Sequence, residues 1–377
     1  MLVTIDFPPL FGGVANYWAQ LCRQMASADI VVLAPECDDS LDFDIKQNFL
    51  IYRKVLLSKS KWLWPKWLAL LYWTWRLARQ ERIEKIIVTH ILPVGTVALI
   101  LKMVLRLPYI VSVHGLDIAL PLASKIKTWL VKKILCQADA VIANSDFTRN
   151  ELLKFGCGQG NEVEVIYPCP NVRNEKILPE DVNEWREKYQ LKEKRIILTA
   201  GRLIERKGHD KMIEALPQIL EKAPNAVYLI VGSGANEGYL KELAQGLAVE
   251  NHILFFPDII DSEMLIFYNL ADVFVMPCRC LENGDVEGFG IVYLEANSFG
   301  KPVIAGRTGG APEAVEHGVN GLLVDPLDVN KIARAVVSLL SDEQQASELG
   351  ERGRRRVAEK FNWEEQGRKL IKIVNGL

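Results

Sequence analysis

Short runs of Val, Ile and other apolar residues recur along this chain, and between them apolar positions repeat every three or four residues. The short runs are typical of buried strands, and the longer periodic stretches are typical of amphipathic helices. Their alternation predicts an α/β protein in which parallel strands are joined by crossover helices. The predicted strands are 2–6, 29–35, 49–56, 85–91, 108–115, 140–145 and 163–168, followed by 195–202, 226–234, 252–258, 273–277, 302–306 and 321–325.

A polar stretch without a predicted strand, residues 171–194, separates the two series of strands. A chain of 377 residues is also long for a single core. We therefore predict two doubly wound domains in tandem, 1–170 and 195–360, with the connection between them at 171–194. Ligands of such sheets bind beyond the carboxyl ends of the strands, so the cleft between the domains is the expected site.

The composition is that of a globular protein, with 49% hydrophobic and 24% charged residues. Residues 1–170 hold 19 Lys and Arg against 15 Asp and Glu, so this half is expected to meet any anionic surface. Seven scattered cysteines, with Cys278 and Cys280 spaced C-x-C, indicate reduced cytoplasmic thiols rather than a disulfide frame or zinc site. We expect no signal peptide and no membrane span, because Pro, Lys or Arg interrupts the apolar stretches 62–75 and 91–107.

Three glycine-bearing turns follow predicted strands: PPLFGGVANY at 8–17, GRLIERKG at 201–208 and VGSG at 231–234. Glycines at a strand-to-helix turn let backbone N–H groups approach an anion, and the helix N-terminus adds partial positive charge. The middle turn also carries Arg202 and Lys207, which could neutralise a diphosphate from two sides. The alternatives are tight turns that bind no ligand and two solvated surface cations.

The stretch DVEGFGIVYLE at 285–295 places two glutamates eight residues apart, with GFG between them. GFG can supply free amides at the start of a helix over 291–300, on which Ile291 and Glu295 share a face. Glu295 then suits ribose hydroxyls, and Glu287, which precedes the amides, suits a neutral polyol. Carboxylates on both sides of an anion site indicate a nucleotide sugar. The alternative is a helix N-terminal charge and one buried, paired glutamate.

DVEGFGIVYLE resembles the E-x7-E motif of the retaining glycosyltransferases of family GT4, which have the GT-B fold of two Rossmann-like domains facing across a cleft. Five further stretches look like the same family and occur in its order: PPLFGGVANY, SVHGLD at 112–117, GRLIERKG, ADVFVMP at 271–277 and GKPVIAGRTGGAPEAVEHGVNGLLVDP at 300–326. Together these stretches span nearly the whole chain. EGFGIVYLEA and GGAPEAV are also similar to bacterial phosphatidylinositol-mannoside mannosyltransferases that use GDP-mannose.

The resemblance implies a donor site in the C-terminal domain. Arg202 and Lys207 match the pair that holds the donor diphosphate. Glu295 matches the glutamate that binds the ribose hydroxyls, and Glu287 matches the one that faces the donor hexose. The backbone amides that contact sugar and phosphate in the family are matched by those of Phe289, Gly290, Ile291 and Val292. The nucleoside side is matched by Gly232, Ser233 and Gly234.

The N-terminal domain contributes residues at two predicted strand ends. By resemblance, Gly12 and Gly13 match the loop near the diphosphate and acceptor, and His114 matches a histidine beside the donor sugar. His114 lies at a strand end where ligands bind, although a histidine satisfied within the core is the alternative. His90 has a similar position and stays undecided, and Asp117 is a candidate only for orienting its loop.

The last segment, 361–377, resembles the terminal helix that crosses back to the first domain. We expect no metal site, because the D-x-D of Asp42 and Asp44 follows no apolar strand and is interpreted as a solvated acidic loop. The family likeness implies catalysis without a metal or other cofactor, in which Arg202 and Lys207 stabilise the developing charge instead.

The expected mechanism follows from where charge develops. Breaking the bond between sugar C1 and phosphate leaves a diphosphate anion and an oxocarbenium-like sugar. We expect the acceptor hydroxyl to attack from the same face while its proton passes to the leaving phosphate oxygen, so that configuration is retained without a protein nucleophile. Double displacement through Glu287 is the competing mechanism.

The acceptor side is less specific. Residues 46–85 hold ten Lys or Arg and two Glu together with Trp62, Trp64, Trp67, Trp73 and Trp75. Farther on, lysines surround a predicted stripe of Ile126, Leu130 and Ile134. Basic amphipathic helices with aromatic residues suit an anionic membrane interface. The alternative is helices packed on the sheet with solvated lysines, which the nearly all-apolar stretch 66–78 favours.

We therefore expect transfer of a hexose, with mannose from GDP-mannose as the leading donor, to a lipid-linked or cell-surface glycan. The alternatives are a UDP-sugar-dependent transferase of the same family, a nucleotide-sugar epimerase on the same fold, and a non-catalytic nucleotide-sugar-binding module. A phosphorylase would need a longer chain and a pyridoxal-phosphate lysine. We expect no nucleic-acid partner, and a cytoplasmic location with peripheral contact to the membrane through the N-terminal domain.

Overall fold

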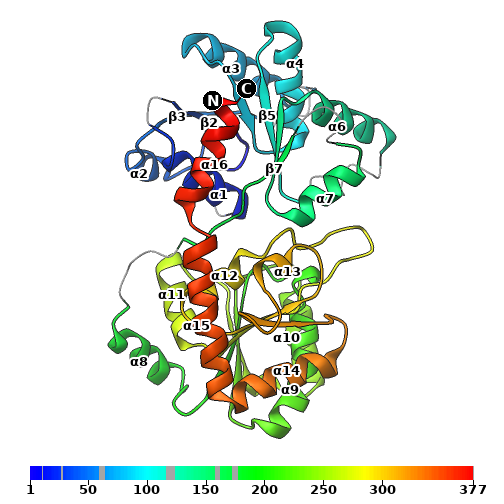
Figure 1. Ribbon diagram of the computed structural model, residues 1–377. Helices are drawn as coiled ribbons and strands as arrows, with labels where there is room; N and C mark the ends of the chain where they lie inside the picture. The colour runs from blue at the N-terminus through cyan, green and yellow to red at the C-terminus, as the bar shows by residue number, and fades with distance from the viewer. Residues whose placement is uncertain are drawn as a thin grey trace. The chain divides into compact units, whose positions relative to one another are not determined.

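The computed structural model describes residues 1–10, 12–26, 29–58, 64–115, 124–157, 162–171 and 177–376, apart from the side chains of 261 and 262. The chain divides into two compact units. Unit 1 is Met1–Pro168 with Trp363–Leu377, and unit 2 is Cys169–Asn362. Each unit is built around its own parallel sheet with helices on both faces (Figure 1). The predicted α/β class with two Rossmann-like units is confirmed.

Unit 1 contains a seven-stranded sheet in the order β3-β2-β1-β4-β5-β6-β7, and all its strands are parallel. The strands are β1 (Leu2–Val3), β2 (Val31–Pro35), β3 (Leu50–Lys54), β4 (Ile86–Val88), β5 (Tyr109–Val113), β6 (Ala140–Ala143) and β7 (Val163–Val165). The helices are α1 (Gly13–Arg23), α2 (Ser40–Asp44), α3 (Leu68–Gln80), α4 (Thr96–Leu105), α6 (Lys125–Gln137), α7 (Asp146–Lys154) and α16 (Trp363–Asn375). Each strand predicted for this half is present.

Successive strand residues of unit 1 point into two different cores, because side chains alternate across a sheet. Leu2 and Ile110 pack with α1 and α16 on one face. Val3 and Val111 pack with α3, α4 and α6 on the other. Both faces are therefore covered, which explains why these strands appear as continuous apolar runs in the sequence.

Unit 2 contains a six-stranded parallel sheet in the order β10-β9-β8-β11-β12-β13. Its strands are β8 (Arg195–Ala200), β9 (Ala226–Val231), β10 (Ile253–Phe256), β11 (Val273–Met276), β12 (Val303–Gly306) and β13 (Gly321–Val324). Its helices are α8 (Pro179–Lys188), α9 (His209–Lys222), α10 (Glu237–Gly246), α11 (Asp261–Leu270), α12 (Ile291–Ser298), α13 (Ala311–Ala314), α14 (Val329–Ser341) and α15 (Glu343–Lys360).

In both sheets the strand order reverses beside the first strand, between β1 and β4 in unit 1 and between β8 and β11 in unit 2. Loops that leave neighbouring strands diverge at this point, which leaves a crevice at the carboxyl edge where ligands of such sheets bind. Helices α9, α10 and α14 lie on one side of the sheet of unit 2, and α11, α12 and α15 lie on the other (Figure 1).

Helices α3 and α6 differ from the sequence prediction in what they bury. Helix α3 buries Leu70 and Leu77, but Tyr72 is exposed, so it is not buried all round. Helix α6 packs through Val131, Ile134 and Leu135, whereas Ile126 of the predicted stripe is exposed. Within the described residues, no helix combines the length and apolar character needed to cross a bilayer.

Candidate functional site

The loops that follow β8 and β11 meet at the switch point of unit 2, and charged side chains join them there. Lys207 Nζ and Arg206 Nη1 each lie 2.7 Å from Glu287 Oε2. All three side chains are largely buried, with 11%, 6% and 13% of their surface exposed. The structure therefore brings together the predicted Lys207 and Glu287, and it adds Arg206, which the sequence analysis did not single out.

Opposing effects set the pKa of Glu287. Burial acts to raise it, but Lys207 and Arg206, with a contribution from Arg202, lower it below the ordinary value of 4.5. Glu287 is therefore ionised at neutral pH and can only accept hydrogen bonds. Arg202 itself is exposed at the start of the loop, so this cation and Lys207 differ in burial although both were predicted to hold a diphosphate.

Further contacts hold the two loops together. Arg206 Nε lies 3.0 Å from Asp285 Oδ1, and the backbone N–H of Arg279 donates to the carbonyl of Arg206 across 2.9 Å. The guanidinium of Arg279 in turn donates to Asp210 Oδ1 across 2.8 Å. The contact between Arg206 and Asp285 is an ion pair only, because within the described residues neither of these two buried atoms has a hydrogen-bond partner.

Two glycines after β12 let another backbone approach the acidic loop. Gly310 N–H donates to the carbonyl of Glu287 across 2.9 Å. A Cβ at Gly310 would lie 2.0 Å from the carbonyl oxygen of Gly288, and one at Gly309, whose φ is 57°, would lie 2.3 Å from that of Glu287. The GG of GGAPEAV is thus required sterically, because it supports the loop that carries Glu287.

The two glycine turns after β8 and β9 also pack backbone against backbone. A Cβ at Gly232 would lie 2.4 Å from the carbonyl oxygen of Gly201, and one at Gly234 would lie 2.5 Å from that of Leu203. Leu203 N–H donates to the carbonyl of Ser233 across 2.9 Å. Close packing of the turns accounts for Gly232 and Gly234, while Ser233 and Gly234 are exposed at the carboxyl edge.

Helix α12 begins at the predicted position, immediately after the glutamate loop. Gly290 precedes it with φ 90°, a left-handed conformation that favours glycine. The amides of Ile291 and Val292 lie in the first turn, where an α-helix has no acceptors of its own. Phe289 is buried against Phe361, with ring centroids 5.7 Å apart, so it contributes packing as well as its backbone amide.

Glu295 lies one turn into α12 and is fixed by a tyrosine from α11. Tyr268 Oη donates to Glu295 Oε2 across 2.6 Å. Burial and then the charge of Glu295 raise the pKa of Tyr268 well above its ordinary value, so the phenol keeps its proton. Glu295 is therefore partly buried and paired, which matches the buried, paired glutamate that the sequence analysis gave as the alternative.

The residues predicted in the N-terminal half lie at the carboxyl edge of unit 1. His114 Nε2 is 2.9 Å from Ser112 Oγ, and its ring packs edge-on against Tyr17 with centroids 5.3 Å apart. Burial, with a smaller effect of His90, lowers the pKa of His114 to about 3. His90 Nδ1 is 2.7 Å from Thr89 Oγ1, and burial lowers its pKa to about 4. Both histidines are neutral at physiological pH.

Gly12 and Gly13 begin α1, as predicted, and an aspartate that the sequence analysis missed lies beside them. A Cβ at Gly12 would lie 2.9 Å from Asp6 Oδ2, whereas one at Gly13 would meet nothing within 4 Å. Burial raises the pKa of Asp6. Asp6 lies three residues beyond the end of β1, the first strand of the switch point, and that position was the signal that could have identified it.

The prediction that Asp42 and Asp44 lie in a solvated loop is wrong. Both residues belong to α2, and Asp44 pairs with Arg53 across 2.8 Å. Asp117 lies outside the described residues. Within the residues that the structure describes, no three His, Cys, Asp or Glu side chains gather in a way that could hold a metal ion.

Two protein-family models match the chain. The model for Glycosyltransferase Family 4 matches residues 11–173, and the model for Glycosyl transferases group 1 matches residues 181–356. The GDP-mannose-dependent alpha-(1-6)-phosphatidylinositol monomannoside mannosyltransferase of Mycolicibacterium smegmatis is 32% identical over 380 residues, covering 100% of this chain and 98% of the relative. The chain belongs to the group 1 glycosyltransferases of the GT4 type.

Further similarities extend over the whole glycosyltransferase. The GDP-mannose-dependent monoacylated alpha-(1-6)-phosphatidylinositol monomannoside mannosyltransferase of Corynebacterium glutamicum is 30% identical, covering 99% of this chain and 97% of the relative. Among solved structures, HepE of Anabaena has a TM-score of 0.83 at 21% identity and full coverage of both chains. Sucrose-phosphate synthase of Thermosynechococcus elongatus has a TM-score of 0.81 at 24% identity, covering 100% and 98%. The glycosyltransferase has the GT-B fold that the sequence predicted.

Proposed function

We propose that this glycosyltransferase transfers mannose from GDP-mannose to a lipid-linked or cell-surface glycan acceptor, with retention at the anomeric carbon. The observation that carries the proposal is the buried cluster of Lys207, Arg206 and Glu287 in the loops at the switch point of unit 2. Identities of 32% and 30% to two GDP-mannose-dependent enzymes support this donor. A UDP-sugar is the alternative, since HepE, with the same fold, has been crystallised with UDP and glucose.

The cations of the cluster and the backbone amides at the start of α12 suit a donor diphosphate. Lys207 Nζ carries three donors, so it can hold Glu287 and a phosphate oxygen together. Arg202 is exposed at the mouth of the same loop and adds a second cation. The free amides of Ile291 and Val292 supply neutral donors at the positive end of α12, an arrangement that binds phosphate.

The two glutamates suit the hydroxyls at the two ends of the donor. Glu287 is ionised and accepts hydrogen bonds only, so it is suited to hexose hydroxyls. Glu295 has one oxygen fixed by Tyr268, which orients the carboxylate toward ribose hydroxyls with its remaining acceptor capacity.

Retention by front-face attack fits the state of Glu287 better than double displacement. A carboxylate nucleophile must attack C1, yet Glu287 Oε2 is shared by two cations at 2.7 Å that lower its nucleophilicity. In the front-face reaction the bond from C1 to the diphosphate oxygen breaks, and the acceptor oxygen bonds to C1 on the same face. The acceptor proton passes to the departing phosphate oxygen. Arg202 and Lys207 stabilise the leaving diphosphate in place of a metal ion, and no cofactor takes part.

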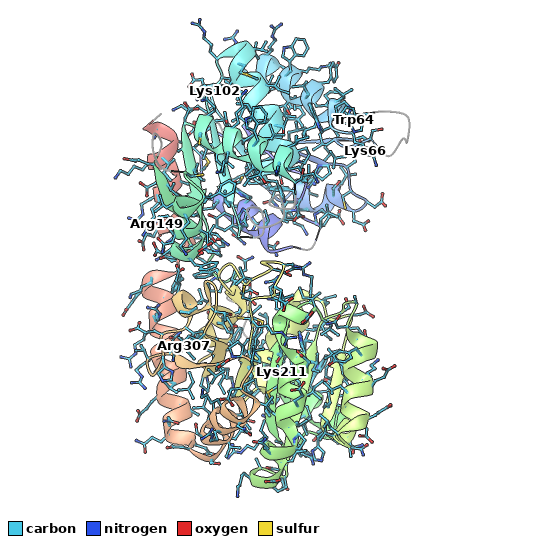
Figure 2. All side chains as sticks on the ribbon, turned by 90° about the vertical axis from the view of Figure 1, so that its right-hand side faces the viewer. Trp64, Lys66, Lys102, Arg149, Lys211 and Arg307 are labelled. Atoms are coloured by element: carbon cyan, nitrogen blue, oxygen red, sulfur yellow. The ribbon has the colours of Figure 1, made fainter. Side chains whose placement is uncertain are left out.

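A lipid-linked acceptor is supported by the surface of unit 1. An apolar groove of about 320 Å³ lies between α3 and α4, lined by Leu68, Leu71, Tyr72, Trp75, Ile100, Leu101 and Val104. Trp64 is 85% exposed just before α3, and Lys66 beside it is exposed as well (Figure 2). Apolar and aromatic groups flanked by cations suit the interface of an anionic membrane, so we place the enzyme at its cytoplasmic face.

A panel of nucleotide sugars tests the donor. Thermal unfolding should shift upward with GDP-mannose, because a ligand at ~100 times its Kd adds about 2.7 kcal/mol of stability. A shift with a UDP-sugar but none with GDP-mannose would contradict the proposed donor. The anomeric configuration of the product, followed by NMR, tests retention. Donor conversion without acceptor would indicate an epimerase, and donor binding without turnover on glycan or lipid-linked acceptors would indicate a binding module.

A glycosyl-enzyme trapped on Glu287 would contradict front-face attack. The enzyme could also fail with mannosyl donors but transfer another hexose with retention. That result would contradict the proposed donor and leave the proposed mechanism in place. The two parts of the proposal are thus tested separately.

A further inference from the structure

Unit 2 contains a cavity of about 680 Å³ that shares no lining residue with the proposed donor site. It lies at the carboxyl ends of β12 and β13 and is bordered by the loop after β11 and by α14. Cavities of a few hundred Å³ or more accommodate small ligands. Four cations line this one, Arg279, Arg307, Lys331 and Arg334, against the single carboxylate of Asp325.

Two of the four cations have carboxylate partners. Arg279 pairs with Asp210 at 2.8 Å and with Glu205 at 3.3 Å. Lys331 pairs with Asp328 at 3.1 Å on the surface of α14. These pairs neutralise most of the charge that Arg279 and Lys331 bring to the cavity.

Arg307 and Arg334 carry the remaining charge. In the described part of the chain, no carboxylate lies within 4.0 Å of either guanidinium. Arg307 donates to the backbone carbonyl of Leu323 at 3.3 Å, and Arg334 donates to that of Asn330 at 3.2 Å. A guanidinium has five N–H donors, so these carbonyls leave most of the capacity of both side chains for a ligand. Arg307 is exposed on the face shown in Figure 2.

Helix α14 adds to the positive potential of the cavity. Its positive N-terminal end adjoins the cavity, and its first turn contains no acidic residue. Lys331 lies in its first turn, where a cation is unfavourable next to the helix dipole. Asp328 caps the helix by accepting from Lys331 N–H at 3.0 Å, which offsets only part of this cost. An anion in the cavity would offset the rest.

The walls between the cations are apolar, formed by Leu323, Val324 and Leu327. The geometry points to a phosphate ester as the ligand: we propose that Arg307 and Arg334 hold its phosphoryl group and that the apolar walls pack against its ester part. Guanidinium groups match the oxygens of a phosphoryl group with paired N–H donors. This site is separate from the donor site and does not depend on which nucleotide sugar is used.

Arg279 connects the cavity with the donor loops. Its side chain lines the cavity, and its backbone N–H donates to the carbonyl of Arg206 at 2.9 Å. Arg206 in turn holds Glu287 at 2.7 Å. A phosphate ester bound at the cavity therefore lies one residue away from the cluster proposed to bind the donor.

Isothermal titration calorimetry of the full chain with glycerol 3-phosphate tests the site. Arg307→Gln and Arg334→Gln should each weaken binding, and the double variant should weaken it at least roughly tenfold, because each removes charge-assisted hydrogen bonds. Arg352→Gln is the matched control. Arg352 is an exposed arginine on α15 that also donates to a carbonyl four residues earlier, at 3.2 Å, but does not line the cavity.

Lys207→Ala distinguishes the two anion sites. It should leave glycerol 3-phosphate affinity unchanged if the cavity holds the ligand. Unchanged affinity in the double arginine variant, or loss of binding in Lys207→Ala alone, would overturn the proposal. Co-sedimentation with phosphatidic-acid vesicles identifies the source. If the double variant loses vesicle binding and Arg352→Gln does not, the ligand is a lipid headgroup. If the double variant loses glycerol 3-phosphate binding but keeps vesicle binding, the ligand is a free phosphate ester.

Discussion

Lys207 donates to the carboxylate of Glu287 across 2.7 Å, although the two residues are 80 positions apart in the sequence. Each was predicted to contact a different part of the donor, and the structure shows in addition that the two side chains contact one another. A diphosphate bound as proposed would share Lys207 with the carboxylate of Glu287. The proposed function therefore predicts that changes at this contact affect stability, donor binding and turnover.

Replacing Glu287 by Gln should affect stability and turnover in different ways. The change leaves Lys207 and Arg206 buried without their shared carboxylate, which should lower the free energy of unfolding by about 3 kcal/mol. Turnover should fall by more than roughly a hundredfold, while nucleotide affinity stays within a few fold. A bound nucleoside diphosphate should stabilise this variant by at most about 1 kcal/mol more than the wild type, which corresponds to a few-fold tighter binding if its charge partly replaces the carboxylate. Thermal unfolding with and without nucleotide, together with steady-state kinetics, measures these effects.

Glu351→Gln provides the control for this variant. Glu351 pairs with Arg354 at 2.9 Å on the exposed surface of α15, so its loss should change neither turnover nor the effect of nucleotide on unfolding. Wild-type turnover in Glu287→Gln would reject the role proposed for Glu287.

Acid should remove the contribution of Glu287 to stability. Its pKa in the folded protein lies below the ordinary value of 4.5, so the stabilisation is fully present above about pH 4.5 and is lost as pH falls through the folded pKa. The difference in unfolding free energy between wild type and Glu287→Gln should therefore be constant near neutrality and shrink below pH 4.5. Chemical denaturation from pH 7 to pH 3 measures this difference. A difference that does not change with pH would mean that Glu287 is not held as an anion by its neighbours.

Tyr268→Phe should weaken nucleotide binding without affecting the chemical step. The change removes the hydroxyl that donates to Glu295 at 2.6 Å, so the carboxylate loses its orientation. A hydrogen bond of this kind contributes about 1.5 kcal/mol to stability, and since it is made within the protein only part of that value bears on binding, so nucleotide affinity should fall by at most roughly tenfold. Glu295→Ala should weaken binding further. Tyr239→Phe, at an exposed tyrosine of α10, should leave the affinity unchanged, and equal affinities for all three variants would refute the ribose assignment.

Gly310→Ala should destabilise unit 2 and displace the glutamate loop. The added methyl group would lie 2.0 Å from the carbonyl oxygen of Gly288, and a backbone cannot move aside cheaply. We expect a loss of about 1–3 kcal/mol in unfolding free energy and weaker donor binding. Gly246→Ala is the control, because a Cβ there meets nothing within 4 Å at the end of α10, and it should be neutral or stabilising. Similar melting temperatures for both variants would show that the contact does not support the loop.

The sheets were predictable because buried parallel strands leave continuous apolar runs, and those runs fix both their number and their order along the chain. The start of α12 was predictable as well, since a glycine followed by an apolar helix marks a helix N-terminus. The stripe on α6 was not, because Ile126 has the spacing of a buried residue and yet lies exposed beyond the end of the packed face. Periodicity predicts which face of a helix is buried. It does not predict how far along the helix the neighbouring elements extend to cover that face.

The partners of the site residues were hidden for a different reason. Arg206 and Lys207 are adjacent, and the sequence alone could not show that both reach Glu287 from a short 3-10 turn, Glu205–Lys207. Tyr268 comes from α11 and Glu295 from α12, so their contact depends on how two helices pack on one face of the sheet. Pairing between single side chains far apart in the sequence leaves no local sequence pattern. The glycines that permit close backbone approach can be recognised by their motifs, but only the fold shows which backbone atoms they approach.

The groove between α3 and α4 should determine membrane binding of the enzyme. Val104 lines it and is 69% exposed, and Trp64 is 85% exposed before α3. Val104→Asp places a carboxylate in the groove, so it should reduce co-sedimentation with anionic vesicles several-fold through repulsion and lost apolar contact. Trp64→Ala should reduce it as well. In the wild type, binding should rise with anionic lipid and fall with salt, because the surrounding lysines and arginines are screened.

Trp129→Ala tests whether the binding face is this groove or the lysine-rich helix α6. Trp129 is also exposed in unit 1, and Lys133 lies 5.1 Å from the centre of its ring. Its loss should leave vesicle binding unchanged. If Trp129→Ala reduces co-sedimentation while Val104→Asp and Trp64→Ala do not, the membrane face is α6. If no variant and no change of salt or lipid alters co-sedimentation, the enzyme does not reach its acceptor through the membrane surface.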